Sequence, residues 1–195
     1  MPNWVDNRLI ITADEETLSS IKAKVNWTEN NNAKLAESLY PLPDALKLVS
    51  GWSDETASYW VDEHGEPQQP PSAEEIGATT LSQYSLTEEQ KAELINEYGA
   101  TNWYQWNILN YGSKWPDCYT EARELNDNKQ IYFSFESAWA PMGTLAERIS
   151  KDFKCKVVLK HYSIENMSEG TMKWDSGHQY YYLSKDVELD WREEE

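Results

Sequence analysis

The sequence contains no run of apolar residues that approaches the roughly 20 needed for a transmembrane helix. Its first residues, Met1 to Arg8, also lack the order of a basic segment followed by an apolar segment that is typical of a secretory signal peptide. We therefore expect a cytoplasmic protein, located in a host cell, with no membrane partner.

Cysteine is scarce, because Cys118 and Cys155 are the only two. Disulfides are rare in the cytoplasm, so both are expected to be free thiols. The histidines His64, His161 and His178 do not show metal-ligand spacing, and HExxH, CxxC and glycine-rich phosphate-binding motifs are absent from the sequence. These patterns predict no metal, no cofactor and no catalytic residues, and so favour a protein that is not an enzyme.

Basic residues are few, with 17 Lys and Arg against 34 Asp and Glu, which gives a net charge of -17. Residues 54–97 hold eleven acids and one base, and residues 186–195 hold six acids and one base. This acidity disfavours direct binding to nucleic acid or to an anionic membrane. It suits binding to a basic protein, and it equally suits solubility alone.

The periodicity of apolar residues predicts both strands and helices. Short runs rich in β-branched and aromatic residues predict strands at 8–12, 130–136, 156–162 and 179–183. Helical spacing predicts helices at 17–25, 34–40, 103–111 and 141–153. A further helix is predicted to begin at Thr87, which forms a capping box with Gln90, and to end at Gly99.

The order of these elements is β-α, then a long irregular and helical segment, then β-α-β-β. It predicts one α+β domain over 1–195, with helices on one face of a mostly antiparallel sheet. An acidic helical insertion is expected at about 45–100, and an acidic tail at 186–195. Sheets of this kind often pair edge to edge, so the arrangement is compatible with a homodimer.

Three motifs resemble a known family. They are MPNW with Asn7-Arg8-Leu9, the stretch from 102–104 to 112–115, and FESAWAP at 135–141. In this order they resemble the YubB-like proteins of conjugative plasmids and phages, over most of the chain outside roughly 45–85 and the tail. The resemblance implies a ferredoxin-like fold without an iron–sulfur cluster and a gene on a mobile element. It implies no established activity, and the typical relative has Cys where this chain has Val5.

The acidic insertion is the first candidate binding surface. Glu89, Glu93 and Glu97 recur every four residues, so they are expected to line one face of their helix. Such a row can imitate the phosphates of a duplex and occupy a nucleic-acid-binding groove, while a solvated helix face is the alternative. The candidate residues are Asp54, Glu55, Asp62, Glu63, Glu66, Glu74, Glu75, Glu88, Glu89, Glu93 and Glu97.

Tryptophans provide a second candidate surface, formed by Trp103, Trp106, Trp115 and Trp139. These rings could stack on bases or on a peptide. They could equally form core, because Trp103 and Trp106 stand at helical spacing beside Ile108. A separate basic run could contact phosphates or merely offset the acidic segments; it comprises Arg148, Lys151, Lys154, Lys156 and Lys160.

These patterns predict a non-enzymatic protein of a phage or plasmid that binds and inhibits a host defence complex of the CRISPR or restriction type. The expected partner is a basic nucleic-acid-binding protein or nuclease complex, on which an acidic, DNA-mimic-like surface docks. The link to mobile elements comes from the resemblance, and the docking mode comes from the charge distribution. The alternatives are a peptide or small-ligand binding module that uses the sheet and the tryptophans, or an accessory protein of plasmid or phage maintenance.

Overall fold

The computed structural model describes residues 3–25, 35–51, 57–69, 82–125, 129–165 and 167–186. The acidic tail beyond Asp186 lies outside the described residues. The chain divides into two compact units, one formed by Met1–Tyr40 with Tyr111–Glu195 and the other by Pro41–Asn110. We call them the sheet unit and the 41–110 unit. The insertion expected at 45–100 falls within the second.

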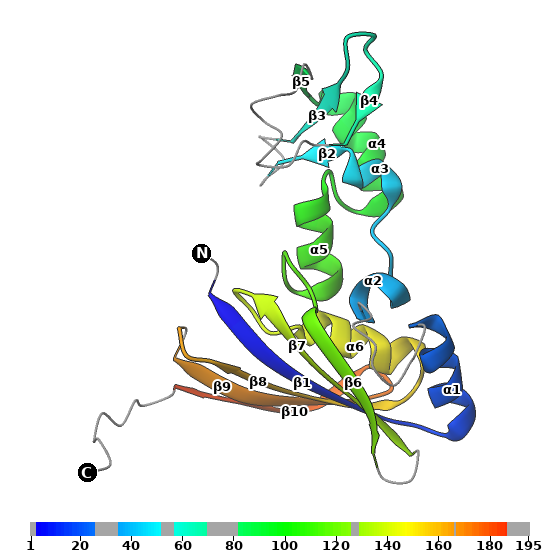
Figure 1. The fold of residues 1–195 in the computed structure, drawn as a ribbon, viewed down its shortest axis with the longest axis vertical. Coiled ribbons are helices and arrows are strands. Elements are labelled where there is room, and N and C mark those ends of the chain that lie inside the picture. The colour runs from blue at the N-terminus through cyan, green and yellow to red at the C-terminus, as the bar shows by residue number, and fades with distance from the viewer. Residues whose placement is uncertain are drawn as a thin grey trace. The chain divides into compact units, whose positions relative to one another are not determined.

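The sheet unit contains a six-stranded antiparallel sheet in the order β10-β9-β8-β1-β7-β6 (Figure 1). Its strands are β1 (Trp4–Thr12), β6 (Cys118–Leu125), β7 (Gln130–Ala138), β8 (Lys156–Ser163), β9 (Ser168–Asp175) and β10 (His178–Asp186). Its helices are α1 (Glu15–Lys24), α2 (Leu35–Leu39) and α6 (Gly143–Asp152). The predicted α+β class and the antiparallel sheet are confirmed.

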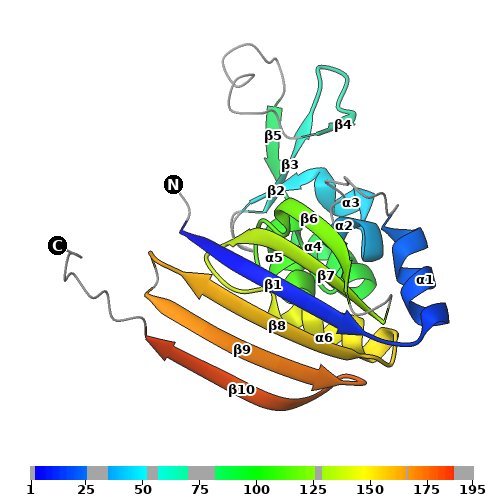
Figure 2. The ribbon, with the colours of Figure 1, turned by 60° about the horizontal axis from the view of Figure 1, so that its bottom comes forward.

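Alternation along the strands separates the two faces of this sheet. In β1, Leu9 and Ile11 are buried while Arg8 is exposed, as period-two geometry requires. Helices α1 and α6 lie on the same side of the sheet (Figure 2). They contribute buried residues such as Leu18 and Leu145 to the core. In β1, β7 and β8 the opposite face therefore carries the more exposed residues of each strand.

The 41–110 unit combines short helices with a small sheet. Its helices are α3 (Asp44–Lys47), α4 (Glu88–Tyr98) and α5 (Trp103–Tyr111), the last of which ends at the boundary between the units. Its strands are β2 (Val49–Ser50), β3 (Ser58–Val61), β4 (Pro67–Gln68) and β5 (Ser82–Ser85). Strand β3 pairs with β5 over its whole length and with β2 and β4 over one half each, so it is the central strand.

The prediction that this insertion is helical is therefore wrong in part, because it also holds a four-stranded sheet. These strands have only two to four residues, which is too short for an alternating pattern to be recognised. A small core of Val49, Ala57 and Leu86, with Tyr59 and Leu94 packed against it, holds the sheet on α4. None of the helices in the described segments is long and apolar enough to cross a membrane.

Candidate functional site

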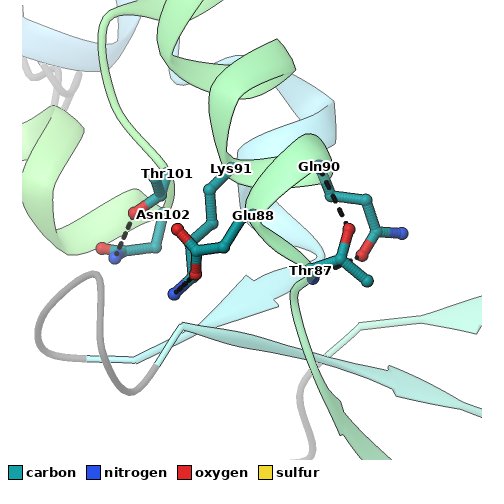
Figure 3. Close-up of polar contacts among 6 residues, drawn as sticks. All are labelled: Thr87, Glu88, Gln90, Lys91, Thr101 and Asn102. Atoms are coloured by element: carbon teal, nitrogen blue, oxygen red, sulfur yellow. Dashed lines mark hydrogen bonds and ion pairs between the residues drawn. The ribbon is translucent and has the colours of Figure 1, made fainter.

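Helix α4 positions the predicted acidic row. The Thr87 hydroxyl accepts a hydrogen bond from the Gln90 amide at 3.2 Å, and the Thr87 amide donates to Oε1 of Gln90 at 2.9 Å (Figure 3). The helix ends at Gly99, whose φ of 75° is left-handed and suits glycine. The predicted capping box and stop are confirmed, so α4 begins and ends at fixed residues without help from a partner.

The acidic side chains of α4 face solvent. Glu88, Glu89, Glu93 and Glu97 are all exposed, and no residue of the helix is buried. Lys91 forms an ion pair with Glu88 at 3.1 Å. Glu89 and Glu93 form no ion pair within the described part of the chain. Negative charge on this helix is consequently compensated at one position only.

A turn between β3 and β4 gives one acidic residue a structural role. Oδ1 of Asp62 accepts hydrogen bonds from the amides of His64 at 2.9 Å and Glu66 at 3.0 Å, and Oδ2 accepts one from Gln68 at 3.1 Å. The hydrogen bonds from the Glu66 and His64 amides hold the pKa of Asp62 below its usual value. Glu63 and Glu66 are exposed beside it.

Part of the predicted acidic surface cannot be placed, because Asp54, Glu55, Glu74 and Glu75 lie outside the described residues. The acidic residues that the structure does place come from two elements of the 41–110 unit, the β3–β4 turn and α4. They are Asp62, Glu63, Glu66, Glu88, Glu89, Glu93 and Glu97.

The sheet unit holds a lysine–tryptophan cluster, which consists of Trp4, Lys114, Trp115 and Trp139. Nζ of Lys114 lies 4.0 Å from the ring centre of Trp115 and 5.6 Å from that of Trp139. The rings of Trp4 and Trp115 are 6.3 Å apart. Lys114 is only 8% exposed, whereas Trp115 and Trp139 are 38% and 50% exposed. The ammonium therefore lies under two rings that remain accessible to a partner.

Backbone hydrogen bonds fix the exposed rings. The amide of Trp139 donates to the carbonyl of Asn3 at 2.8 Å, and the amide of Ala138 donates to that of Trp115 at 3.2 Å. The Ser113 hydroxyl donates to the Ala138 carbonyl at 2.8 Å. Trp139 has a φ of 72°, which is unusual for a bulky residue. Such a conformation persists only where the surrounding structure enforces it, and it often occurs at binding sites.

The four predicted tryptophans are divided between the two units of the chain. Trp115 and Trp139 belong to the cluster in the sheet unit, whereas Trp103 and Trp106 lie on α5 in the 41–110 unit. Trp106 is buried, and Trp103 packs edge-on against Tyr104 at 5.8 Å. Sequence reasoning did not include Trp4 or Lys114 in the surface. The pairing of Trp4 with Ala138 across β1 and β7 is what brings Trp4 close to the other members of the cluster.

Several titratable groups are buried in the sheet unit. Burial raises the pKa of the Cys155 thiol to about 11. It also lowers the pKa of His161, whose Nδ1 has no hydrogen-bond partner among the described residues. The Cys155 thiol lies 3.8 Å from the carbonyl of Ile149. The described residues contain no group of three His, Cys, Asp or Glu side chains able to hold a metal ion.

Comparison with known proteins identifies a fold but no sequence family. No protein-family model matches the sequence, and no curated protein matches it. The crystal structure of a protein api92 from Yersinia pseudotuberculosis, described under the family name DUF1281, is similar with a TM-score of 0.53. The match covers 96% of this chain and 99% of that chain at 12% identity. At this identity the likeness concerns the α+β architecture alone.

Proposed function

We propose that this protein is a non-enzymatic interaction protein whose 41–110 unit docks on a basic, nucleic-acid-binding surface of another protein. The observation that carries the proposal is the exposed carboxylate row of α4. The 41–110 unit contains twelve acidic and two basic residues, so it accounts for a net charge of -10 out of -17. The two bases, Lys47 and Lys91, are each paired with an acid of their own helix.

The spacing of the row suits a phosphate-binding groove. Residues four apart on a helix rise by about 6 Å along its axis, so Glu89, Glu93 and Glu97 present a repeating line of negative charge. Like charges at this spacing repel and weaken an isolated helix. The capping box and the small core that hold α4 offset this repulsion. A basic groove that meets the row would displace the cations associated with its carboxylates, as it displaces those condensed on DNA.

The element order supports a more specific origin. If α2 and the 41–110 unit are set aside as insertions, the elements β1, α1, β6, β7, α6 and β8 follow the βαββαβ order of a ferredoxin-like core. Their sheet order β8-β1-β7-β6 fits the same pattern, which β9 and β10 extend. Together with the motifs that resemble YubB-like proteins, this pattern favours a protein of a phage or plasmid. The expected partner is then a host defence complex of the CRISPR or restriction type, which binds nucleic acid through basic surfaces.

A phage-plating assay tests this proposal. The protein would be expressed in bacteria that carry a defined CRISPR or restriction system, and the efficiency of plating of a targeted phage would be measured. The wild-type protein should raise plating, and the variant Glu89→Lys/Glu93→Lys/Glu97→Lys should not. The matched control Glu121→Lys/Glu147→Lys/Glu165→Lys changes the net charge equally at exposed positions of the sheet unit and should retain protection. The proposal would be rejected if both variants protected the phage equally. It would also be rejected if the wild-type protein failed to raise plating against any of the systems tested.

The lysine–tryptophan cluster supports a second candidate, a site for a peptide or small ligand. Its two accessible rings are held by Lys114 and by a strained Trp139 backbone, so they are preorganised for stacking. In this case Trp139→Ala should abolish binding of a captured partner while the α4 variant retains it. The reverse pattern would assign the interaction to the 41–110 unit.

A further inference from the structure

The face of the sheet opposite α1 and α6 carries six cations beside the five acids Asp6, Glu121, Glu136, Glu169 and Asp175, so it is close to neutral in an otherwise acidic chain. Side chains at alternate positions of each strand share this face. Six cations occupy it, and they are Arg8, Arg123, Lys156, Lys160, Lys173 and Lys185.

Four of these cations have a partner. Arg123 lies 4.6 Å from the ring centre of Tyr132, and Lys173 lies 4.7 Å from that of Tyr181. Lys156 approaches Asp175 at 4.0 Å. Lys185 forms an ion pair with Glu169. The positive charge of each of these four side chains is thus stabilised by a neighbouring side chain of the protein.

Arg8 and Lys160 differ from the other four. They stand directly opposite each other on β1 and β8. Neither side chain makes a hydrogen bond, ion pair or ring contact with any residue that the structure describes. Two like charges directly opposite on adjacent strands repel each other. An anion between them would relieve this repulsion and accept hydrogen bonds from both.

Both cations line the same pocket. It has a volume of about 380 Å³, and Tyr162, Thr171 and Leu183 also contribute to its walls. This size lies within the range of small-molecule sites, which is about 300–1,000 Å³. The pocket therefore combines two cations with a hydroxyl, an aromatic ring and an aliphatic side chain.

We propose that this pocket binds a nucleotide, with the phosphate held by Arg8 and Lys160 and the base placed against Tyr162 and Leu183. The guanidinium and the ammonium are the groups that proteins use for phosphate. A tyrosine ring can stack on any base. Asp6 also lines the pocket and has no cationic partner in the described structure. Its carboxylate can accept hydrogen bonds from sugar hydroxyls or an exocyclic amine.

The net charge of the chain does not oppose this site strongly. Among the pocket residues, Lys185 and Glu169 neutralise each other, which leaves Arg8 and Lys160 against Asp6, with Glu136 opposite Asp6 on β7 as a further nearby acid. At physiological salt, exposed charges farther away than about 8 Å are largely screened. The proposal does not rest on the function proposed for the 41–110 unit, because all of its residues belong to the sheet unit.

Titration calorimetry with defined probes tests the site. The probes are AMP, adenosine, inorganic phosphate and a single-stranded DNA oligonucleotide of about ten nucleotides. AMP should bind at least about tenfold more tightly than adenosine and than inorganic phosphate, because the site recognises both parts. An oligonucleotide at least about tenfold tighter than AMP would assign the phosphate to a nucleic-acid strand, and equal affinity would assign it to a free nucleotide.

Matched variants distinguish binding at this pocket from a general effect of positive charge on the same face. Arg8→Gln/Lys160→Gln should weaken AMP binding by about tenfold or more and abolish the rise in melting temperature that AMP gives the wild-type protein. The control Arg123→Gln/Lys173→Gln removes the same charge from the same face, and it should change affinity less than about twofold. No binding of AMP or oligonucleotide at millimolar concentration, AMP no tighter than phosphate, or equal losses in both variants would overturn the proposal.

Discussion

Replacing Gly170 with Ala tests how closely β8, β9 and β10 pack around His161. Gly170 lies opposite His161 on β8 and Ser184 on β10. A Cβ atom there would lie 2.4 Å from Nε2 of His161 and 2.5 Å from the carbonyl oxygen of Leu183. Gly170 is not among the glycines with a positive φ, so the strain from a methyl group would be steric.

The size of the effect follows from these two contacts. Each is about 1 Å shorter than an ordinary van der Waals contact. The His161 ring can rotate, but the Leu183 oxygen belongs to the β9–β10 ladder and can move only with the strand. Overpacking of this kind costs about 1–3 kcal/mol. We expect Gly170→Ala to lose about 2 kcal/mol of unfolding free energy, which lowers the melting temperature by about 4–8 °C in a chain of this size.

Urea unfolding followed by tryptophan fluorescence, together with calorimetry, would measure this loss. Gly143→Ala is the matched control, since its Cβ would meet the flexible end of Met172 at 3.3 Å and the Trp174 ring at an ordinary 4.0 Å. Its stability should change by less than about 0.5 kcal/mol or increase through helix propensity. The double variant Gly170→Ala/His161→Ala removes the clash with the imidazole ring but keeps the clash with the Leu183 oxygen. It should therefore recover only part of the lost unfolding free energy. A Gly170→Ala protein as stable as the wild type would refute the packing described around His161.

Two further predictions concern buried groups of the sheet unit. Burial lowers the pKa of His161 below its usual 6.5, so in that range the unfolded chain binds a proton that the folded chain does not. Stability, measured as the urea midpoint, should therefore decline as pH falls below about 6.5. His161→Gln should make this decline smaller. A His161→Gln protein with the same pH profile as the wild type would contradict this expectation. A thiol reagent should modify half-buried Cys118 in the native protein well before Cys155, because the pKa of Cys155 is about 11 and its thiolate is scarce. Comparable labelling rates, measured by mass spectrometry of peptides, would show that Cys155 is accessible.

The regular parts of the fold could be predicted because their signals are local. Strands β1, β7 and β8 alternate between one buried and one exposed face, so their apolar residues recur at period two. Asp14 and Thr87 cap α1 and α4 as their sequences indicate, since a cap depends on residues only three positions apart. Strand β1 begins four residues earlier than predicted, because polar Asp6 and Asn7 interrupt the apolar run.

Strands β6 and β9 were not predicted, and each has a physical reason. The register of β6 against β7 shifts between Cys118 and Glu121, and Tyr119 has a positive φ, so the alternation is broken. Strand β9 has few β-branched residues, and it contains Gly170, where the ring of His161 occupies the space of a side chain. In both strands, contacts with a neighbour override the local preference of the sequence.

The candidate sites show the same division between local and long-range information. The row of Glu89, Glu93 and Glu97 follows from helical spacing alone. The lysine–tryptophan cluster and the opposed pair of Arg8 and Lys160 require the register of β1 with β7 and β8, which joins residues more than a hundred positions apart. Without an alignment of strands, neither cluster can be read from the chain.

The acidic row and the Arg8–Lys160 pocket have opposite charges, and this difference allows the two to be separated in one set of variants. Added salt should weaken both interactions, so salt dependence alone identifies neither surface. Charge reversal on α4 leaves every pocket residue in place, so nucleotide binding should stay constant or tighten while docking on a basic protein is lost. Neutralising Arg8 and Lys160 makes the chain more negative, so docking should be retained while nucleotide binding falls. A variant that lost both activities would have lost its fold, which its melting temperature would reveal. Each activity is assigned to its own unit only if the α4 variant loses docking alone and the Arg8/Lys160 variant loses nucleotide binding alone.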